Sequence, residues 1–508
     1  MDQATILVVA ACLAAATAAL ILRRPRNGKP PGGVALLPPV ASGVSAIAAL
    51  GTLVTKGLPA VIHDLHGELG SVFTVSLLGL KKVTFLVGPE VTTHFFKGSE
   101  SEIRQSDIYK ITVPIFGRGV LFDVDLPTRS RQISLSSATQ PTILQPMHAR
   151  RFLSDAIKPV NLRGHVDSMV REVEDYFGKW GEHGTVDLKQ ELGLVLMRIA
   201  NRCLLGEQIG DNMFDEVTHL LHELFENGLH MTSLFFPYLP IPPHRRRDAA
   251  RAKLGEIFHE AVRARRASGR AENDVLQKLV ESRYADGRPV TESEIAGLLI
   301  GMIFAGQHTS ASAAIWTGAC LLSHGDGRHL VAAVEEQKQI IARHGRERVD
   351  YDVLREIGIL RCCIMEALRM HAPANVIIRQ ANKSFSLQAR DGGRYAIPKG
   401  HTLVTSPAVN NRLPHIFKDP LVYDPSRFGP GREEDKVGGK FSFTPFSAGR
   451  HVCLGEDYAY MQIKVIWSHL LRNFELKIIS PFPDEEWEKF IPGPRGKVIV
   501  TYKRRPLE

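Results

Sequence analysis

The chain has 508 residues, of which 44% are hydrophobic and 23% are charged, and this composition excludes a mainly disordered protein. The formal net charge of +9 is consistent with binding to nucleic acid, to an anionic membrane or to an acidic protein partner. Basic and acidic residues are mixed along the chain, and the densest basic runs, 244–251 and 263–270, lie in amphipathic, helical-looking stretches. We therefore expect solvated helix faces and no nucleic acid partner.

The first predicted element is an apolar helix over residues 4–22. At 1.5 Å per residue it would span roughly 28 Å, which is close to the thickness of a bilayer's hydrocarbon core. No basic residue precedes it, whereas Arg23, Arg24, Arg26 and Lys29 follow it directly, so the segment 1–27 is predicted to be an uncleaved, single-pass signal anchor with the rest of the chain in the cytosol. A cleaved signal peptide and a buried core helix are the alternatives.

Residues 28–40 are rich in proline and glycine, which predicts a stiff extended hinge without helix or sheet. From residue 41 to 508 the composition does not change and no repeat occurs, so we expect one large domain that is mainly α with a minor β region. Helical periodicity covers 216–229, 254–262, 294–322 and 356–370, and short β-rich stretches cover 71–78, 84–87 and 403–405.

A short loop carries the strongest chemical signal. It reads FSAGRHVCLG from Phe446 to Gly455 and precedes a helical stretch at 458–471. A thiolate that ligates haem iron must be shielded from oxidation and supplied with hydrogen bonds. Gly449 and Gly455 allow backbone N–H groups to turn toward the sulfur of Cys453, and Phe446 can cover it. The other five cysteines have apolar surroundings, and the six show no spacing typical of disulfides or zinc.

This loop before a helix resembles the signature of the cytochrome P-450 superfamily. The resemblance implies the P-450 fold, with haem b as cofactor, Cys453 as the axial ligand of its iron, and His451 or Arg450 near a haem propionate. It also assigns a structural triad behind the haem to Glu366 and Arg369 of an E-x-x-R motif, together with Arg427.

A polar break interrupts the long apolar helix predicted at 294–322. It consists of Ala305, Gly306, Gln307, His308 and Thr309. Taken alone, such a break can be a threonine bonded back to a carbonyl and a histidine satisfied by its neighbours. By resemblance it is the superfamily's kink for oxygen activation, where Gly306 opens room, Thr309 holds a proton-delivering water and His308 relays protons.

Gln-His-Thr is typical of the sterol 14α-demethylases, and the resemblance to that family covers most of the chain. It includes a substrate loop at 109–120 and an entrance segment at 235–247. It implies haem propionate contacts from Tyr109, Arg379 and Arg131 or Arg129. It implies a sterol cavity lined by Ile111, Phe116, Phe122, Gly301, Phe304 and Ala305. The aliphatic Ile111 favours a sterol with two methyl groups at carbon four, such as lanosterol or eburicol.

The chain departs from that family at several positions. Ser447 replaces a glycine and Val452 an arginine in the cysteine loop, Phe122 replaces a tyrosine, and Asn375 stands where a hydrophobic residue is expected. The segment 126–152 contains three prolines where the family has a regular helix.

The resemblance implies oxidative removal of the 14α-methyl group as formate in sterol biosynthesis. Electrons from NADPH would come through a separate NADPH-cytochrome P-450 reductase, because the chain has no glycine-rich nucleotide-binding unit. The expected location is the endoplasmic reticulum membrane, with the catalytic domain on the cytosolic side, as a monomer inhibited by azoles. A monooxygenase for another lipid such as a fatty acid, and a non-catalytic haem or sterol-binding protein, are the alternatives.

Overall fold

A computed structural model describes residues 35–77, 81–105, 107–133, 159–206, 213–229, 233, 236–269, 274–284, 286–345 and 349–505. The predicted anchor, residues 28–34 of the hinge and residues 134–152 of the irregular segment lie outside these ranges. The chain forms two compact units. The first comprises Met1–Asp107, Arg369–Val422 and Pro430–Val452, and the second comprises Ile108–Leu368, Tyr423–Gly429 and Cys453–Glu508.

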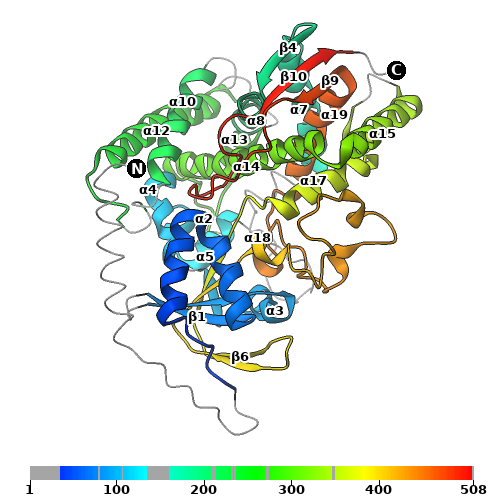
Figure 1. The fold of residues 1–508 in the computed structure, drawn as a ribbon. Coiled ribbons are helices and arrows are strands. Elements are labelled where there is room, and N and C mark those ends of the chain that lie inside the picture. The colour runs from blue at the N-terminus through cyan, green and yellow to red at the C-terminus, as the bar shows by residue number, and fades with distance from the viewer. Residues whose placement is uncertain are drawn as a thin grey trace, which may run out of the picture. The chain divides into compact units, whose positions relative to one another are not determined.

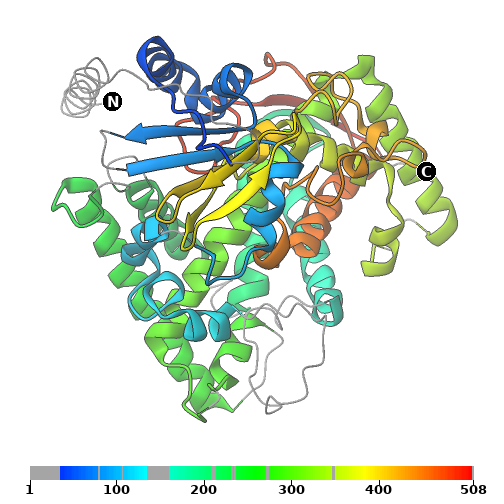
Figure 2. The same cartoon turned by 90° about the horizontal axis from the view of Figure 1, so that it is seen from below.

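The first unit is built on a five-stranded sheet in which segments far apart in the sequence lie side by side (Figure 2). Its order is β1 (Val72–Leu77), β2 (Lys81–Leu86), β8 (Thr402–Thr405), β5 (Ile377–Ala381) and β3 (Ile103–Gln105). Only β2 and β8 pair in parallel. Strand β8 is buried along its length, as expected of a central strand. The hairpin β6 (Phe385–Gln388) and β7 (Arg394–Ile397) and the helices α2 (Gly43–Leu69), α3 (Pro89–Lys97) and α18 (Pro407–Asn410) complete the described part of this unit.

The end of the predicted hinge is extended, but it pairs with strands, which the composition did not indicate. The N–H of Leu36 donates to Arg394 O at 2.8 Å, and Thr74 N donates to Pro39 O at 2.8 Å. Isolated bridges therefore join Leu36 to β7 and Val40 to β1. An extended stretch leaves its backbone groups free to pair, so residues 36–40 are fixed on this unit.

The second unit is mainly helical (Figure 1). Its helices are α4 (Val113–Phe116), α5 (Leu126–Ile133), α7 (Pro159–Phe177), α8 (Leu188–Leu205), α10 (Phe214–Gly228), α12 (Pro242–Ser268), α13 (Val275–Glu281), α14 (Glu292–Ser323), α15 (Arg328–His344), α16 (Tyr351–Glu356), α17 (Ile359–Met370), whose last residues belong to the first unit, and α19 (Glu456–Asn473). A small antiparallel sheet adds β4 (His183–Asp187), β10 (Ile499–Arg504) and β9 (Phe474–Ile478), in that order.

Helix α14 forms the centre of the second unit and packs against α8, α12 and α19. Thr291 and Glu294 form a capping box at its start. Gly318 permits close packing, because a Cβ there would lie 2.2 Å from the Trp467 ring. Among the described residues, α14 is the one helix long and apolar enough to cross a membrane, but most of its apolar stretch is buried inside the protein. This is the burial expected of a core helix.

The expected helix at 356–370 begins later than predicted: α17 begins at Ile359, and Glu356 is the last residue of α16. Glu336 of α15 accepts hydrogen bonds from the N–H groups of Gly358, Ile359 and Leu360, at 2.7, 2.6 and 2.9 Å. A carboxylate there satisfies the free donors at the N-terminus of α17, so a new helix begins. The interruption depends on a residue of another helix and gives no local sequence signal.

The expectation of solvated basic faces on α12 was only partly right. Arg245 and Arg246 are exposed, but Arg247 and Arg265 are 2% and 4% exposed. Arg265 Nη2 lies 2.7 Å from Asp274 Oδ2, and Arg247 Nη1 donates to Pro237 O at 2.8 Å. Each buried guanidinium has an oxygen partner, as burial of a charge requires.

Candidate active site

Cys453 lies in the second unit, directly before α19. Its side chain reaches solvent, yet the protein atoms around it raise the pKa of the thiol by desolvation. The N–H of Gly455 bonds to the sulfur and lowers this pKa, whereas the charge of Glu456 raises it. The position before a helix and the N–H directed at sulfur match the predicted role of the loop.

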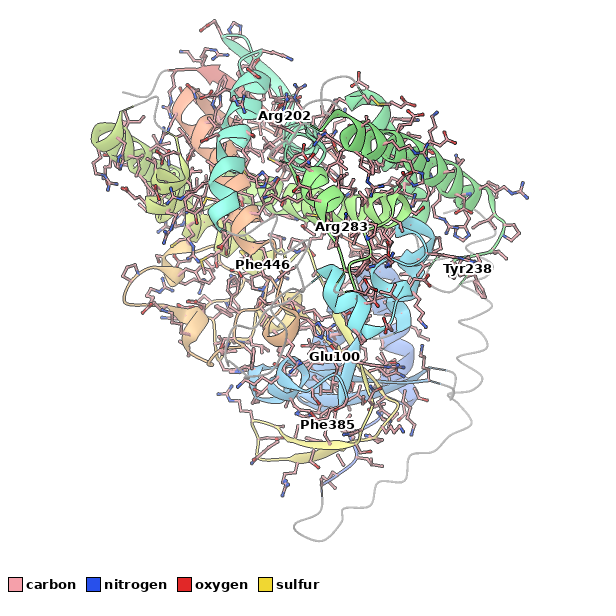
Figure 3. All side chains as sticks on the ribbon, turned by 180° about the vertical axis from the view of Figure 1, so that it is seen from behind. Glu100, Arg202, Tyr238, Arg283, Phe385 and Phe446 are labelled. Carbon is pink, nitrogen blue, oxygen red and sulfur yellow. The ribbon has the colours of Figure 1, made fainter. Side chains whose placement is uncertain are left out.

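The preceding residues of the loop belong to the first unit. Gly449 has φ +66°, and a Cβ there would lie 2.1 Å from the carbonyl oxygen of Phe96, so no other residue fits. Ser447 also has a positive φ, 61°. This conformation favours glycine, which is the usual residue at this position in the family that the loop resembles. His451 Nε2 lies 2.6 Å from Glu100 Oε1, a partner that the sequence did not indicate. Glu100 is labelled in Figure 3.

These residues fit a haem-thiolate site. The loop presents a solvent-accessible sulfur with a backbone N–H bonded to it, and Gly449 keeps the backbone against Phe96 without a side chain. The raised pKa of the free thiol is no obstacle, because a bound metal ion deprotonates its thiol ligand.

The predicted structural triad is deeply buried. Arg427 Nε lies 3.0 Å from Glu366 Oε1, and the N–H of Asp424 donates to the same oxygen at 2.8 Å, all within the second unit. Arg369, in the first unit, donates to the carbonyl oxygens of Asn411 and Val422 at 3.1 and 3.4 Å. All three triad side chains are at most 1% exposed, which suits a structural role.

On α14 the polar break lies within one continuous helix. Thr309 Oγ1 donates to the carbonyl oxygen of Ala305 at 2.6 Å, which is the back-bonding that the sequence left open as an alternative. A Cβ added to Gly306 would meet nothing within 4 Å, so this glycine leaves space beside the helix. The back-bond leaves the lone pairs of the Thr309 hydroxyl available to a water or a substrate.

His308 is surrounded by aromatic rings. Its ring centroid lies 5.0 Å from that of Phe225 on α10 and 5.6 Å from that of Phe304, and its Nδ1 is buried with no hydrogen-bond partner among the described residues. Burial lowers the pKa of His308 to about 4, although part of the ring is exposed, with Glu226 raising it and His222 and Lys489 lowering it further. The imidazole is therefore neutral at physiological pH.

The predicted sterol-lining residues lie partly together in the second unit. Phe116 and Phe304 have ring centroids 5.9 Å apart, and a Cβ at Gly301 would approach Leu121 to 3.0 Å and Phe116 to 3.9 Å. Ile111 is buried, whereas Ala305 is exposed. Gly301 thus lets α14 approach the 113–121 segment closely.

Tyr109 and Phe122 stack on each other, with ring centroids 5.1 Å apart, and the guanidinium of Arg129 lies over the Phe122 ring at 5.7 Å. Arg131 belongs to α5, and its side chain lies outside the described part of the structure. Arg379, in the first unit, is 4% exposed and lies over the ring of Phe95 at 5.5 Å. Propionate contacts by these residues stay predictions.

The start of the irregular segment is more ordered than its prolines indicated. Helix α5 includes Pro127 in its first turn, and Gln132 near its end is fully buried. The Gln132 amide accepts from Leu121 N at 2.7 Å and donates to Tyr284 Oη at 3.2 Å. The helix is thereby tied to the segment that carries Phe122.

Comparison with known proteins shows the family of this chain. The sequence pattern of the family described as Cytochrome P450 matches residues 38–499. A sterol 14-demethylase of Arabidopsis thaliana is 52% identical over 89% of this chain and 88% of its own length. An obtusifoliol 14-alpha demethylase of Sorghum bicolor is 48% identical over 94% of this chain and 92% of its own length. A lanosterol 14-alpha demethylase of Bos taurus is 33% identical over 92% of this chain and 90% of its own length.

A solved structure shares the fold. The retinoic acid-bound cyanobacterial CYP120A1 superposes with a TM-score of 0.76, covering 93% of this chain and 100% of its own, at 20% sequence identity. This likeness concerns the fold alone.

Proposed function

Because the chain belongs to the cytochrome P450 family, we propose that it is a sterol 14α-demethylase, which uses NADPH and dioxygen to remove the 14α-methyl group of a sterol as formate. The observation that carries the proposal is that one chain contains both the Cys453 loop and a polar break of Gln307, His308 and Thr309 on the central helix. Relatives about half identical over nearly the whole chain carry the matching names.

Haem b, ligated through Cys453, supplies the oxidising chemistry when it is bound. Gly455 tunes the sulfur by its hydrogen bond, and the shielding role of Phe446 stays a prediction. Thr309 orients a water through the lone pairs of its hydroxyl, while the hydroxyl proton is donated to the Ala305 carbonyl oxygen. His308, neutral at physiological pH, accepts a proton on one ring nitrogen and donates from the other, which is what a relay needs.

The buried aromatic and aliphatic side chains position the substrate. Phe116, Phe304 and Ile111 form apolar surface that excludes water and favours a sterol ring system over a polar substrate. Gly306 leaves space beside α14 for the reacting carbon to approach. Orientation of this carbon is the protein's main contribution to rate.

The finer assignments extend the proposal. Electrons come from NADPH through a separate NADPH-cytochrome P450 reductase, and the enzyme is a monomer anchored by residues 4–22 in the endoplasmic reticulum membrane. Ile111 favours lanosterol or eburicol, with two methyl groups at carbon four. Two plant relatives are instead named for obtusifoliol, which has one, so the sterols must be compared directly.

The test is reconstituted turnover of the purified full chain with a reductase, NADPH and equimolar lanosterol, eburicol and obtusifoliol, with products identified by mass spectrometry. A 14-demethylated sterol that accumulates only with NADPH supports the proposal, and the product ratio identifies the preferred substrate. The ferrous carbonyl spectrum should show a thiolate-type Soret band.

Cys453→Ser should abolish both the thiolate-type band and the turnover, whereas Cys203→Ser, which changes a buried cysteine of the same unit, should keep the band. A thiolate band without any demethylated sterol overturns the assigned reaction. Fatty acid hydroxylation in that case would indicate a monooxygenase for another lipid, and spectral shifts with sterol but no turnover would indicate a binding protein.

A further inference from the structure

A buried amide holds the loop at residues 119–123. The side chain of Gln132 on α5 is fully buried, and its Oε1 accepts from Leu121 N at 2.7 Å. Its Nε2 donates to Gly119 O at 3.0 Å and to Tyr284 Oη at 3.2 Å. A glutamine amide has one acceptor oxygen and two N–H donors, so it makes all three bonds at once. The amide therefore takes up both a donor and an acceptor of the loop backbone.

The hydrogen bonds of Gln132 continue to the start of α14. Tyr284 Oη donates to Glu294 Oε1 at 2.9 Å, and Arg288 donates to both oxygens of the same carboxylate, each at 3.1 Å. Glu294 also forms the capping box with Thr291. Burial opposes ionisation of Glu294, but the hydrogen bonds from Arg288 and Thr291 outweigh it and lower its pKa. The chain of bonds thus ends on a charged acceptor that belongs to the cap of the central helix.

The loop also lies directly on α14. A Cβ at Gly297 would lie 2.3 Å from Phe116 O and 2.8 Å from Val120 Cγ2, and a Cβ at Gly301 would lie 3.0 Å from Leu121 Cδ1. The two glycines are four residues apart and share one face of the helix. A side chain at either position would crowd the loop, so the placement of the loop determines the surface on this face of α14.

The backbone of the loop needs a restraint at Leu121. Its φ is +51°, in the left-handed region that a leucine rarely adopts. Gln132 accepts the N–H of this residue and thereby stabilises the conformation that directs the Leu121 side chain to Gly301. The next residue is Phe122, which is predicted to line the sterol cavity together with Gly301. Loss of the restraint should therefore be felt at the cavity wall.

We propose that Gln132 is a positioning residue for substrate binding: by tying the 119–123 loop to the cap of α14, it keeps Leu121 against Gly301 at the predicted sterol cavity. The inference rests on the proposed function, because that cavity is the one assigned to the sterol. A loop that is not fixed beforehand must be ordered when the substrate binds, and this ordering weakens binding. The effect should fall on KM and not on kcat, because the reacting groups are unchanged.

The test compares variants of Gln132 in the haem-loaded full chain. Gln132→Met keeps the size of the side chain and removes all three bonds. It should raise KM for the sterol about tenfold, as expected for a buried hydrogen bond that is lost, and change kcat less than about twofold. Gln132→Glu should also raise KM, because a carboxylate cannot donate to Gly119 O. Tyr284→Phe leaves both loop bonds in place and should raise KM only about threefold.

A matched control separates this role from a general loss of stability. Gln337 of α15 is also fully buried, and it accepts from Arg472 Nε of α19 at 2.9 Å. Gln337→Met should destabilise the fold and leave KM unchanged. Hydrogen–deuterium exchange gives a second readout without sterol. The peptide 117–124 should exchange faster in Gln132→Met than in the wild type, and at the wild-type rate in Gln337→Met.

Unchanged exchange of this peptide in Gln132→Met overturns the inference, and so does an unchanged KM or a loss confined to kcat. If Gln132→Met does not fold, the KM of Tyr284→Phe decides in its place. Faster exchange in a protein that turns over no sterol would retain the restraint of the loop by Gln132 and discard the proposed reaction. If another lipid is turned over instead, the same comparison is made with the KM for that lipid.

Discussion

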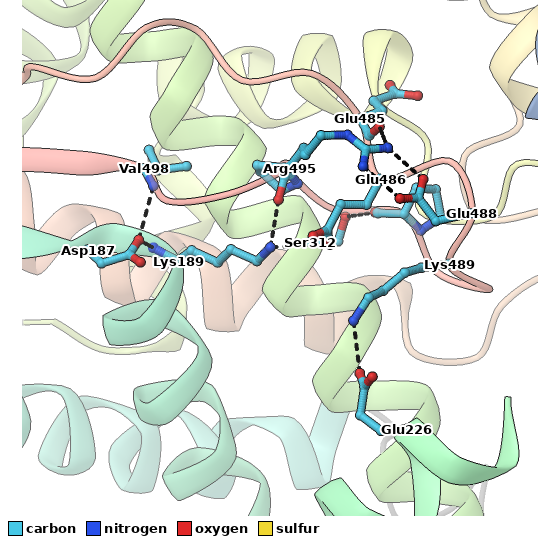
Figure 4. Close-up of polar contacts among 12 residues, drawn as sticks. Asp187, Lys189, Glu226, Ser312, Glu485, Glu486, Glu488, Lys489, Arg495 and Val498 are labelled. Carbon is cyan, nitrogen blue, oxygen red and sulfur yellow. Dashed lines mark hydrogen bonds and ion pairs between the residues drawn. The ribbon is translucent and has the colours of Figure 1, made fainter. Parts of the chain in front are cut away.

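Two ion pairs of the second unit have the same N–O distance and opposite surroundings. Arg427 and Glu366 are 3.0 Å apart and at most 1% exposed, whereas Lys489 and Glu226 are 3.0 Å apart and nearly half exposed. A buried charge that loses its partner keeps its desolvation cost, while an exposed one is taken over by water. Distance alone therefore does not distinguish a pair that stabilises the fold from one that water screens at the surface, as at Lys489 and Glu226 in Figure 4.

The largest expected effect is at the buried pair. Glu366→Gln should lower the free energy of unfolding by about 3–5 kcal/mol, because the Arg427 guanidinium would be left buried without its carboxylate. Urea unfolding followed by tryptophan fluorescence measures this. Glu256→Gln, at the exposed pair on α12, is the matched control and should change the value by less than about 0.5 kcal/mol. Equal losses in the two variants would contradict the comparison.

His308 tests the same rule with a buried group that has no charge partner. Its pKa of about 4 in the folded protein lies below the ordinary 6.5, so the unfolded chain binds a proton more readily. At pH above 6.5 the group has no effect, and stability is lost as the pH falls from 6.5 toward 4. The melting temperature of His308→Gln should therefore fall less than that of the wild type between pH 6.5 and pH 4, as measured by thermal unfolding at each pH. An equal fall in melting temperature with pH in the wild type and the variant would show that His308 is not buried as described.

Ser447 combines a positive φ with a buried hydroxyl oxygen that has no partner among the described residues. Ser447→Gly should raise the free energy of unfolding by about 1 kcal/mol, because glycine adopts this backbone conformation without the steric cost of a Cβ. Ser447→Ala removes only the hydroxyl and should raise the free energy of unfolding by less than Ser447→Gly does. A glycine variant less stable than the alanine variant would show that the backbone is not strained here.

The smallest effect on stability is expected at the exposed pair. Lys489→Met should change the free energy of unfolding by less than about 0.5 kcal/mol at neutral pH, because water replaces the lost contact on Glu226. Urea unfolding at low and high salt measures this, and the small difference should shrink further as salt screens the pair. A loss of stability comparable to that of Glu366→Gln would mean that Lys489 stabilises the fold. That result would contradict the comparison of the buried and the exposed pair.

Short motifs with strict chemical requirements could be located from the sequence, while their functional roles stay predictions. The Cys453 loop precedes a helix, the polar break at Gly306, His308 and Thr309 lies on α14, and Glu366 and Arg427 form an ion pair. Each depends on a residue type and a local spacing, which the chain carries with it. The family and its fold follow from these motifs.

Other features depended on which distant segments meet. No local pattern indicates that Glu100 lies beside His451, Glu336 at the start of α17 or Glu226 beside Lys489. A carboxylate on a helix looks the same in sequence whether it faces water, a helix end or a histidine. The sequence by itself determined the chemistry that this protein carries, whereas packing in three dimensions decided which charges are buried and which are paired.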